Sequence, residues 1–330
     1  MDRAVWFVGP RQIELRPVEI PPLARGEVLV RTLCSGVSAG TEMLAYRGEL
    51  PADLAIDESI GALGGTFAYP FRYGYSCVGR VEARAPDVDS PAVGDPVFAF
   101  QTHQERFVSA AAELVPVPDL APRLGVLLPY VETALQVTLD AGAVLGDTVV
   151  VSGLGVLGLL VATLVERAGG RVVAIEPQPW RRAVAAELGI TAVDPNDAVE
   201  PISDLDSGVP MVIECSGNPA ALASALDLLA HEGTVLVASW YGSKPVSLPL
   251  GGRFHRRRLT IRSTQVSSIP AAQSGRWSRR RRLLHAVELA ASLPLERLGT
   301  DIVPFERAGD GYARVAAGEA GVIHMAFGYG

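Results

Sequence analysis

The sequence of 330 residues predicts an α/β protein that joins a β-rich region to a doubly wound parallel sheet. Up to about residue 124, short apolar segments are separated by Gly and Pro, a pattern typical of β-rich structure. Beyond that point apolar strands alternate with helical stretches, which predicts a parallel sheet covered on both faces. A chain of this length exceeds the usual single core, so we expect two domains.

The β-rich region is predicted from short strand-like segments bounded by turn residues. We expect strands at residues 5–7, 12–16, 26–32, 79–83 and 95–100. Residues 50–73 show no clear period and contain many small residues. They predict a long loop, and long loops in compact domains are often functional.

The alternating region is predicted from a change of period at the end of each apolar run. We expect its strands at residues 148–152, 171–175, 210–214, 234–238 and 259–263. We expect its helices at residues 131–142, 157–168, 181–188 and 219–230. The tail adds helices at residues 276–292 and 308–317 and a last strand at 321–327.

The most specific motif is VVVSGLGVLG at residues 149–158, where a β-branched strand breaks into a glycine series. Gly153 permits the tight turn, Gly155 lets the backbone approach a pyrophosphate, and Gly158 lets the following helix pack close to the strand. This series is typical of the Rossmann dinucleotide-binding fold. The alternative is a tight turn between strand and helix that binds nothing.

The residues after the glycines predict how a dinucleotide is held. The helix begins at Val156 and Leu157, whose N–H groups and dipole favour phosphate. Glu176 ends the second strand, where a carboxylate accepts hydrogen bonds from ribose hydroxyls and repels a 2′-phosphate. NAD is therefore favoured, although Arg181 and Arg182 could pair with the 2′-phosphate of NADP.

The composition limits the classes of partner. The net charge of −7 argues against nucleic-acid binding, and no apolar run reaches membrane-spanning length. The basic runs at residues 255–258 and 279–282 are interpreted as solvated faces, with an anionic partner as the alternative. Cys34, Cys77 and Cys215 are scattered and odd in number, so no disulfide framework is indicated. The N-terminus has no signal-peptide core, so we expect a cytoplasmic protein.

Several local motifs together resemble the medium-chain dehydrogenase/reductase superfamily, which includes zinc alcohol dehydrogenases and quinone oxidoreductases. The resemblance covers essentially the whole chain. Its motifs are GEVLVRTLCSGVSAGTE, YGYSCVGRV, VGDPVFAF, VIECSG and the ending VPFERAGDGYARVAAGEAGVIHMAFG.

This resemblance implies a particular division of the chain. It implies a GroES-like catalytic domain at residues 1–125, a Rossmann domain at 126–267, and a return to the catalytic domain at 268–330. The cofactor would lie in the cleft between the domains. Relatives often form dimers by pairing edge strands of the nucleotide domain, so a homodimer is possible.

The zinc ligands of the superfamily are missing from the matching positions. The segment that matches the ligand motif C-G-T-D lies in SAGTE, residues 38–42. Tyr75 stands where a ligand His is expected, and Pro129 stands at the third position if Thr133 is the Thr that touches nicotinamide. The chain also lacks the four cysteines of a structural zinc site. We therefore predict no catalytic and no structural zinc.

Without a metal, hydrogen-bond donors must stabilise the charge that develops on a substrate oxygen. By the resemblance, Tyr75 points toward the substrate and Thr41 and Ser38 flank the same site. His103 lies in the loop that replaces the zinc lobe and titrates in the range useful for acid–base catalysis. The alternatives are a packed cleft wall for Tyr75 and an exposed loop histidine for His103.

The resemblance also predicts the cofactor path. Nicotinamide is expected near Thr133, with Ser216 and Gly217 on one side and Ser239 and Trp240 in the following turn. Core packing is an equally good account of Trp240.

Three functions remain open at this point. The first is a zinc-independent oxidoreductase that interconverts an alcohol and a carbonyl by hydride transfer on a small molecule that the sequence does not identify. The second is an NADPH-dependent reductase of quinones or enones. The third is a nucleotide-binding module whose catalytic site is vestigial.

Overall fold

The fold was obtained as a computed structural model, which describes residues 1–197 and 208–330. These residues divide into two compact units, which are described separately. Unit 1 combines Met1–Pro129 with Val287–Gly330, and unit 2 is Tyr130–Ala286. The two boundaries fall inside helices α3 (Leu128–Ala141) and α8 (Arg279–Ser292), near the start of one and the middle of the other.

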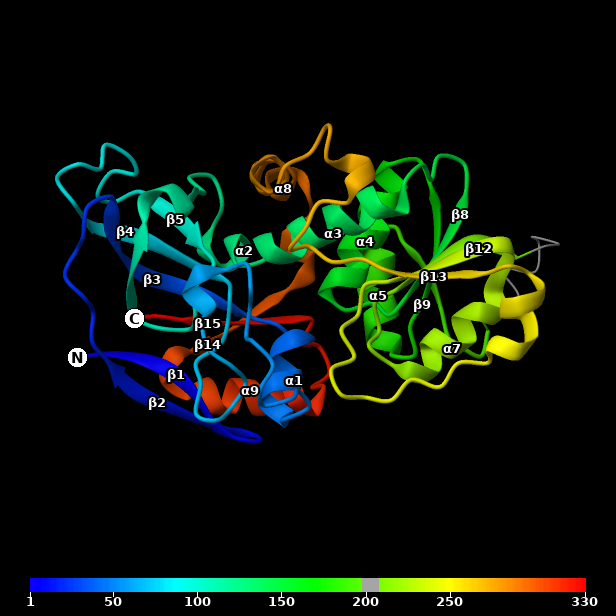
Figure 1. Cartoon of the computed structure of the whole chain (residues 1–330), viewed down its shortest axis with the longest axis horizontal. Helices are drawn as coiled ribbons and strands as arrows, with labels where there is room; N and C mark the ends of the chain where they lie inside the picture. Colours follow the sequence, from blue (N-terminus) through cyan, green and yellow to red (C-terminus); the bar gives the residue numbers. More distant parts are fainter. Residues whose placement is uncertain (198–207) are drawn as a thin grey trace. The chain divides into compact units, whose positions relative to one another are not determined.

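Unit 1 is built on a seven-stranded sheet with the order β14-β15-β3-β4-β5-β7, in which β6 also pairs with β3. Its strands are β3 (Glu27–Val37), β4 (Cys77–Arg84), β5 (Pro96–Ala99), β6 (Arg106–Ala110), β7 (Val115–Pro116), β14 (Thr300–Pro304) and β15 (His324–Gly328). The last strand, β15, runs antiparallel to β3, with Met325 opposite Val37. The predicted completion of the N-terminal β-rich domain by the C-terminal tail is therefore confirmed (Figure 1).

A separate hairpin and two helices enclose an aromatic core in unit 1. The hairpin is β1 (Asp2–Gly9) with β2 (Gln12–Val18), and the helices are α1 (Thr41–Arg47) and α9 (Ala308–Ala317). The short α2 (Pro122–Gly125) contacts β3, β4 and β14 instead. In this core Phe7 stacks on Phe71 at 5.1 Å between ring centroids, and its edge meets Tyr312 at 5.2 Å. Phe71 belongs to the predicted long loop, which also places Ile56, Leu63 and Phe67 in this core while many of its other residues stay exposed.

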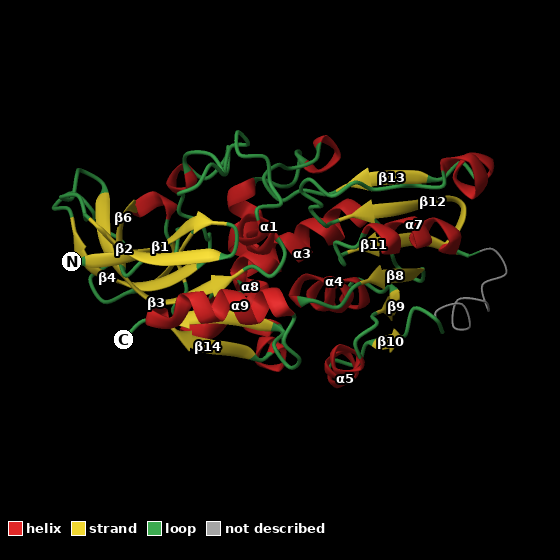
Figure 2. Cartoon of the chain, turned by 90° about the horizontal axis from the view of Figure 1, so that it is seen from below, coloured by secondary structure: helices red, strands yellow, loops and turns green. Residues whose placement is uncertain are grey.

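Unit 2 contains a six-stranded sheet with the order β10-β9-β8-β11-β12-β13, and every neighbouring pair is parallel. Figure 2 shows this order from β13 down to β10. The strands are β8 (Thr148–Ser152), β9 (Arg171–Ile175), β10 (Thr191–Val193), β11 (Val209–Glu214), β12 (Leu229–Val237) and β13 (Thr260–Ser263). The order reverses between β8 and β11, and ligands of such sheets bind at this reversal.

Helices of unit 2 pack on this sheet: α4 (Val156–Arg167) contacts β8 and β9, α5 (Pro179–Glu187) contacts β10, and α7 (Pro219–Leu228) contacts β11 and β12. The predicted doubly wound parallel sheet is confirmed. Across the described ranges no helix is both long and apolar enough to cross a membrane.

Candidate functional site

The glycine loop lies at the point where the sheet order reverses. Gly153 follows β8 with a positive φ of 93°, and a Cβ there would lie 2.6 Å from Ser216 Cα. A Cβ on Gly158 would lie 1.9 Å from the Gly153 carbonyl oxygen. These two glycines are therefore required by the packing of the turn against its neighbours.

Gly155 has a different surrounding. The atom that would lie nearest to a Cβ there is Arg181 Nη1, at 4.0 Å. Gly155 is the N-cap of α4, and no side chain caps the helix. The N–H groups of Val156 and Leu157 have no acceptor within the helix, so this end suits a phosphate.

Glu176 is buried and directed toward the glycine loop. Its Oε2 accepts the Leu154 N–H at 2.8 Å, and its Oε1 accepts the Gln178 N–H at 2.9 Å. Each carboxylate oxygen can accept a second hydrogen bond, so the group can still receive a ribose hydroxyl. Arg181 Nη1 lies 3.9 Å from Oε2, and the guanidinium stacks on Trp180 at 5.0 Å.

Glu214, which the sequence reasoning did not select, organises the second loop of the predicted nucleotide site. It is fully buried at the end of β11, and its Oε1 accepts the N–H groups of Ser216 at 2.6 Å and Gly217 at 3.1 Å. Its Oε2 accepts the Tyr241 hydroxyl at 2.7 Å. Burial and the Glu214 charge raise the pKa of Tyr241. A charged residue that ends an apolar strand was the available signal.

The predicted cofactor residues of this loop lie around Glu214. Ser239 Oγ accepts the Gly217 N–H at 2.9 Å. This hydrogen bond joins the two loops that were predicted to line the cofactor path. Trp240 is 43% exposed, so it does not belong to the core. Thr133 lies on α3, and the preceding Glu132 faces a buried cation.

That cation is Arg282, and here the sequence interpretation was wrong. The run 279–282 was interpreted as a solvated face, yet Arg282 is only 1% exposed. Its Nε lies 3.0 Å from Glu132 Oε1, and its Nη atoms bond Gln136 and the Val266 carbonyl. Helical periodicity turns one of four adjacent arginines inward, where it is buried against α3.

Unit 1 brings three of the predicted catalytic side chains together. Ser38 is 3% exposed, and its Oγ accepts the Thr41 N–H at 3.2 Å. The hydroxyl groups of Ser38 and Thr41 lie close enough to the Tyr75 phenol to lower its pKa. Burial raises the pKa of Tyr75 to about 12, with the Glu42 charge acting in the same direction and the two hydroxyls opposing it. Tyr75 therefore stays protonated at neutral pH.

His103, the fourth predicted catalytic residue, is completely buried. Its Nδ1 lies 2.7 Å from Ser35 Oγ, and its Nε2 lies 3.0 Å from Glu42 Oε2. Both ring nitrogens are thus engaged inside unit 1. This geometry does not match the exposed loop histidine that was the alternative, and it gives the ring no open nitrogen for a substrate.

The residues at the expected zinc positions do not fit a zinc site. Ser38, Thr41 and Tyr75 carry hydroxyl groups, which are weak zinc ligands, and the nearby Glu42 is occupied by hydrogen-bond donors. Within the part of the chain that the structure describes, no group of three or more His, Cys, Asp or Glu side chains is arranged to hold a metal ion.

The fold and the glycine loop define a class: an oxidoreductase fold with a dinucleotide-binding unit. Residues 156–284 match the family model described as zinc-binding dehydrogenase. The chain is 29% identical to 2-desacetyl-2-hydroxyethyl bacteriochlorophyllide A dehydrogenase of Cereibacter sphaeroides over 276 residues, 78% of this chain and 80% of that protein. It is 26% identical to (R,R)-butanediol dehydrogenase of Bacillus subtilis over 82% of this chain and 84% of that protein.

Solved structures share the whole fold. A putative zinc-binding dehydrogenase from Sinorhizobium meliloti 1021, bound to NADP, superposes with a TM-score of 0.78 at 22% identity over 99% of both chains. The predicted resemblance to the medium-chain dehydrogenase/reductase superfamily is confirmed by this family-model match and by these relatives. They support an oxidoreductase of the alcohol and polyol dehydrogenase type.

Proposed function

We propose that this protein is a zinc-independent, NAD-preferring enzyme that interconverts an alcohol and a carbonyl. The observation that carries the proposal is the partly buried Tyr75 phenol, which lies near the hydroxyls of Ser38 and Thr41 and has a pKa raised to about 12. A nicotinamide cofactor supplies or accepts the hydride. The chain must then supply a proton and stabilise negative charge on the substrate oxygen.

In the direction of carbonyl reduction, Tyr75 donates its proton to the oxygen that becomes the hydroxyl group. An alkoxide is a stronger base than a tyrosinate, so this transfer is favourable even with a raised pKa. The Ser38 and Thr41 hydroxyls act to lower the pKa of the phenol, so they stabilise the tyrosinate that remains. In the oxidative direction the same groups receive the proton.

The preference for NAD rests on Glu176, whose charge beside the glycine loop opposes a 2′-phosphate. The second candidate is an NADPH-dependent reductase of enones or quinones. Arg181 supports it, because its guanidinium lies 3.9 Å from the Glu176 carboxylate, where it could pair with the 2′-phosphate of NADPH. The structurally similar dehydrogenase from Sinorhizobium meliloti was solved with NADP bound.

The test combines binding, metal content and turnover on one purified sample. Titration with NADH and NADPH is followed by tryptophan fluorescence, zinc is measured by mass spectrometry, and secondary alcohols, ketones and enones are offered as substrates. We expect tighter binding of NADH, zinc well below one equivalent, and turnover of alcohols or ketones. One equivalent of zinc would reject the zinc-independent mechanism. Turnover of enones with NADPH alone would select the second candidate, and binding without any turnover would indicate a vestigial site.

A further inference from the structure

The histidine inside unit 1 has a defined direction of hydrogen bonding. His103 Nε2 lies 3.0 Å from Glu42 Oε2, and both side chains are fully buried. An ionised carboxylate only accepts hydrogen bonds, so Nε2 donates to Glu42 and Nδ1 faces the Ser35 hydroxyl. Such a pair, buried from water, is held in one geometry by its partners.

Glu42 connects this pair to the turn that carries the catalytic hydroxyls. Its second oxygen, Oε1, accepts the backbone N–H of Ser38 at 2.8 Å. The hydroxyl of Tyr312, on α9, donates to Oε2 at 2.5 Å. The carboxylate therefore fixes the turn from Ser38 to Thr41, where the Thr41 N–H also donates to Ser38 Oγ. The two hydroxyls of this turn lie near enough to the Tyr75 phenol to lower its pKa.

The imidazole ring also lies against the backbone just before Tyr75. Gly74 has a positive φ of 106°, and a Cβ there would lie 2.4 Å from His103 Cδ2. The ring thus occupies the space that a side chain at position 74 would need. It contacts the Tyr75 segment on one side and Glu42 on the other.

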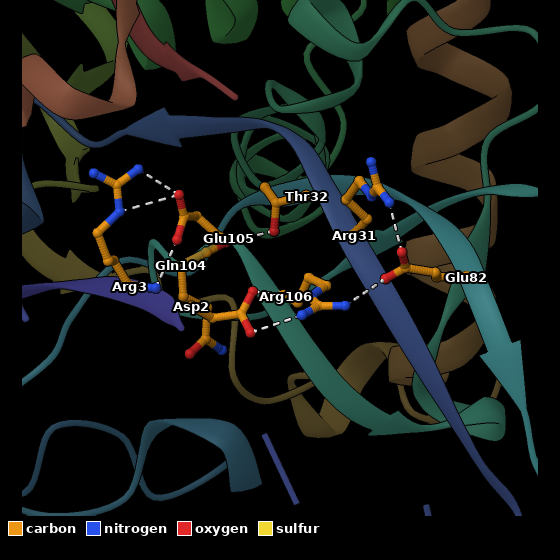
Figure 3. A network of polar contacts seen from close by, with 8 residues as sticks. All are labelled: Asp2, Arg3, Arg31, Thr32, Glu82, Gln104, Glu105 and Arg106. Atoms are coloured by element: carbon orange, nitrogen blue, oxygen red, sulfur yellow. Dashed lines mark hydrogen bonds and ion pairs between the residues drawn. The ribbon is translucent and has the colours of Figure 1, made fainter. Parts of the chain in front are cut away.

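The segment that carries His103 is itself held firmly. The backbone carbonyl of His103 accepts the Val5 N–H at 2.9 Å, so this residue is attached to β1. Figure 3 shows the ion pairs just beyond it, where Glu105 meets Arg3 at 2.5 Å and Arg106 meets Asp2 at 2.8 Å. The Thr32 hydroxyl donates to the Gln104 carbonyl at 2.6 Å, which attaches the same segment to β3 (Figure 3).

We propose that the His103–Glu42 pair is a positioning pair, which sets the orientation of the Tyr75 phenol through the Ser38–Thr41 turn. The inference rests on the proposed function, because the phenol matters only if Tyr75 donates the proton. In this arrangement His103 does not touch the substrate. Its hydrogen bond to Glu42 holds the surrounding side chains in one geometry, as a bound metal ion holds its ligands.

The test compares two substitutions of the same residue. His103→Gln places an amide nitrogen close to the position of Nε2, so it can still donate to Glu42. His103→Asn keeps a polar atom only near Nδ1 and loses that donor. Thr300→Val is the matched control, because it removes a 3.0 Å hydrogen bond to another buried histidine of unit 1, His324, outside this cluster.

Two readouts are made on each variant: steady-state kinetics, and NMR of the full chain labelled with ¹³Cζ-tyrosine, with the Tyr75 signal assigned by Tyr75→Phe. We expect H103N to move the Tyr75 signal and to lower kcat about 10- to 100-fold, the usual effect of losing a supporting residue. We expect H103Q to restore both, and T300V to change neither. The dissociation constant of NADH should stay unchanged throughout.

The outcomes separate this inference from the proposed function. An unmoved Tyr75 signal in H103N overturns the inference, whatever the activity of the wild type. A second outcome is that the Tyr75 signal moves in H103N while the wild-type protein binds NADH but turns over no alcohol, ketone or enone. This outcome supports the positioning role of the pair and rejects the proposed function. Should H103N fail to fold, Glu42→Gln removes the same charge-assisted contact and takes its place, with the same two results expected.

Discussion

Tyr75 shows how a single residue can acquire a chemical role from its surroundings. Its phenol is an ordinary weak acid in water, but burial raises its pKa to about 12, while the nearby hydroxyls of Ser38 and Thr41 act to lower that pKa. The motif alignment of the sequence identified all three residues. It could not identify the buried pair beneath them, because Glu42 and His103 are 61 residues apart and nothing in their local sequence indicates a contact.

Replacing Tyr75 with Phe removes the proton donor and keeps the aromatic packing. We expect kcat to fall about 100- to 1000-fold, the usual effect of losing one donor to a developing oxyanion. The dissociation constant of NADH, measured by tryptophan fluorescence, should not change. A Y75F enzyme with wild-type kcat would contradict the proposed role. Because the wild-type pKa is about 12, ionisation of Tyr75 should not reduce kcat until about one unit below that value.

Among the elements, β9 and α9 have the predicted bounds, and the elements on either side of the glycine loop were predicted almost as well. The strand β8 matches its predicted bounds, and α4 begins one residue early, because the glycine series marks both ends of the turn. Short strands were missed: β10 pairs with the preceding strand, β9, and β14 pairs with the following strand, β15. Their few residues carry no period that a local pattern could detect.

Two glycines of the loop separate binding from packing. Gly155→Ala adds a methyl group with no atom closer than 4.0 Å, so we expect the free energy of unfolding to change by no more than about 1 kcal/mol. The same methyl group lies where the backbone should approach the pyrophosphate, so NADH binding should weaken at least about tenfold. Gly158→Ala is the contrast, because its methyl group would lie 1.9 Å from a carbonyl oxygen. It should lower the melting temperature, measured by calorimetry, and a reversed order of the two effects would contradict this assignment.

The contact between α8 and α3 predicts a dependence of stability on pH. Burial raises the pKa of Glu132, and Arg282 opposes that effect. Arg282→Met leaves the carboxylate buried without its cation, which should cost about 3–5 kcal/mol at neutral pH. A carboxyl with a raised folded pKa favours folding more as pH falls, so this loss should shrink toward the ordinary pKa of Glu.

The control is the double variant Arg282→Met with Glu132→Gln, in which the buried charge is absent. Urea unfolding at several pH values measures all three proteins. The double variant should recover part of the stability lost by R282M and should lose most of the pH dependence. Equal stability of the two variants at every pH would show that the pair is not coupled.

For the whole molecule, alternation predicted the class and the parallel sheet, because these depend on patterns that repeat over many residues, whereas the return of the tail was implied by the resemblance to a family. Burial of single polar groups was not predictable in the same way. Glu214 and Arg282 become buried only because distant segments supply their partners, Tyr241 for the first and Glu132 for the second. These partners are set by the tertiary fold, which a single sequence does not reveal.

The edge of the parallel sheet predicts an assembly. Strand β13 is last in the sheet order, and Thr260 and Ser263 on it are exposed. Open strand edges pair readily with a second copy, so we expect a homodimer in solution. Thr260→Lys with Ser263→Lys places charges on this edge and should give a monomer by analytical ultracentrifugation while NADH binding persists. A wild-type monomer would reject the expectation.

The pairing of β15 with β3 has a consequence for synthesis on the ribosome. Unit 2 is continuous, so all its strands have emerged before the tail is made. Residues 1–129, in contrast, wait for the end of the chain, because β15 covers one side of β3 and Tyr312 completes the contacts of Glu42. Until β15 emerges, the nascent N-terminal half presents an open strand edge, which favours aggregation. Yield of soluble protein should therefore depend on how quickly residues 300–328 are translated.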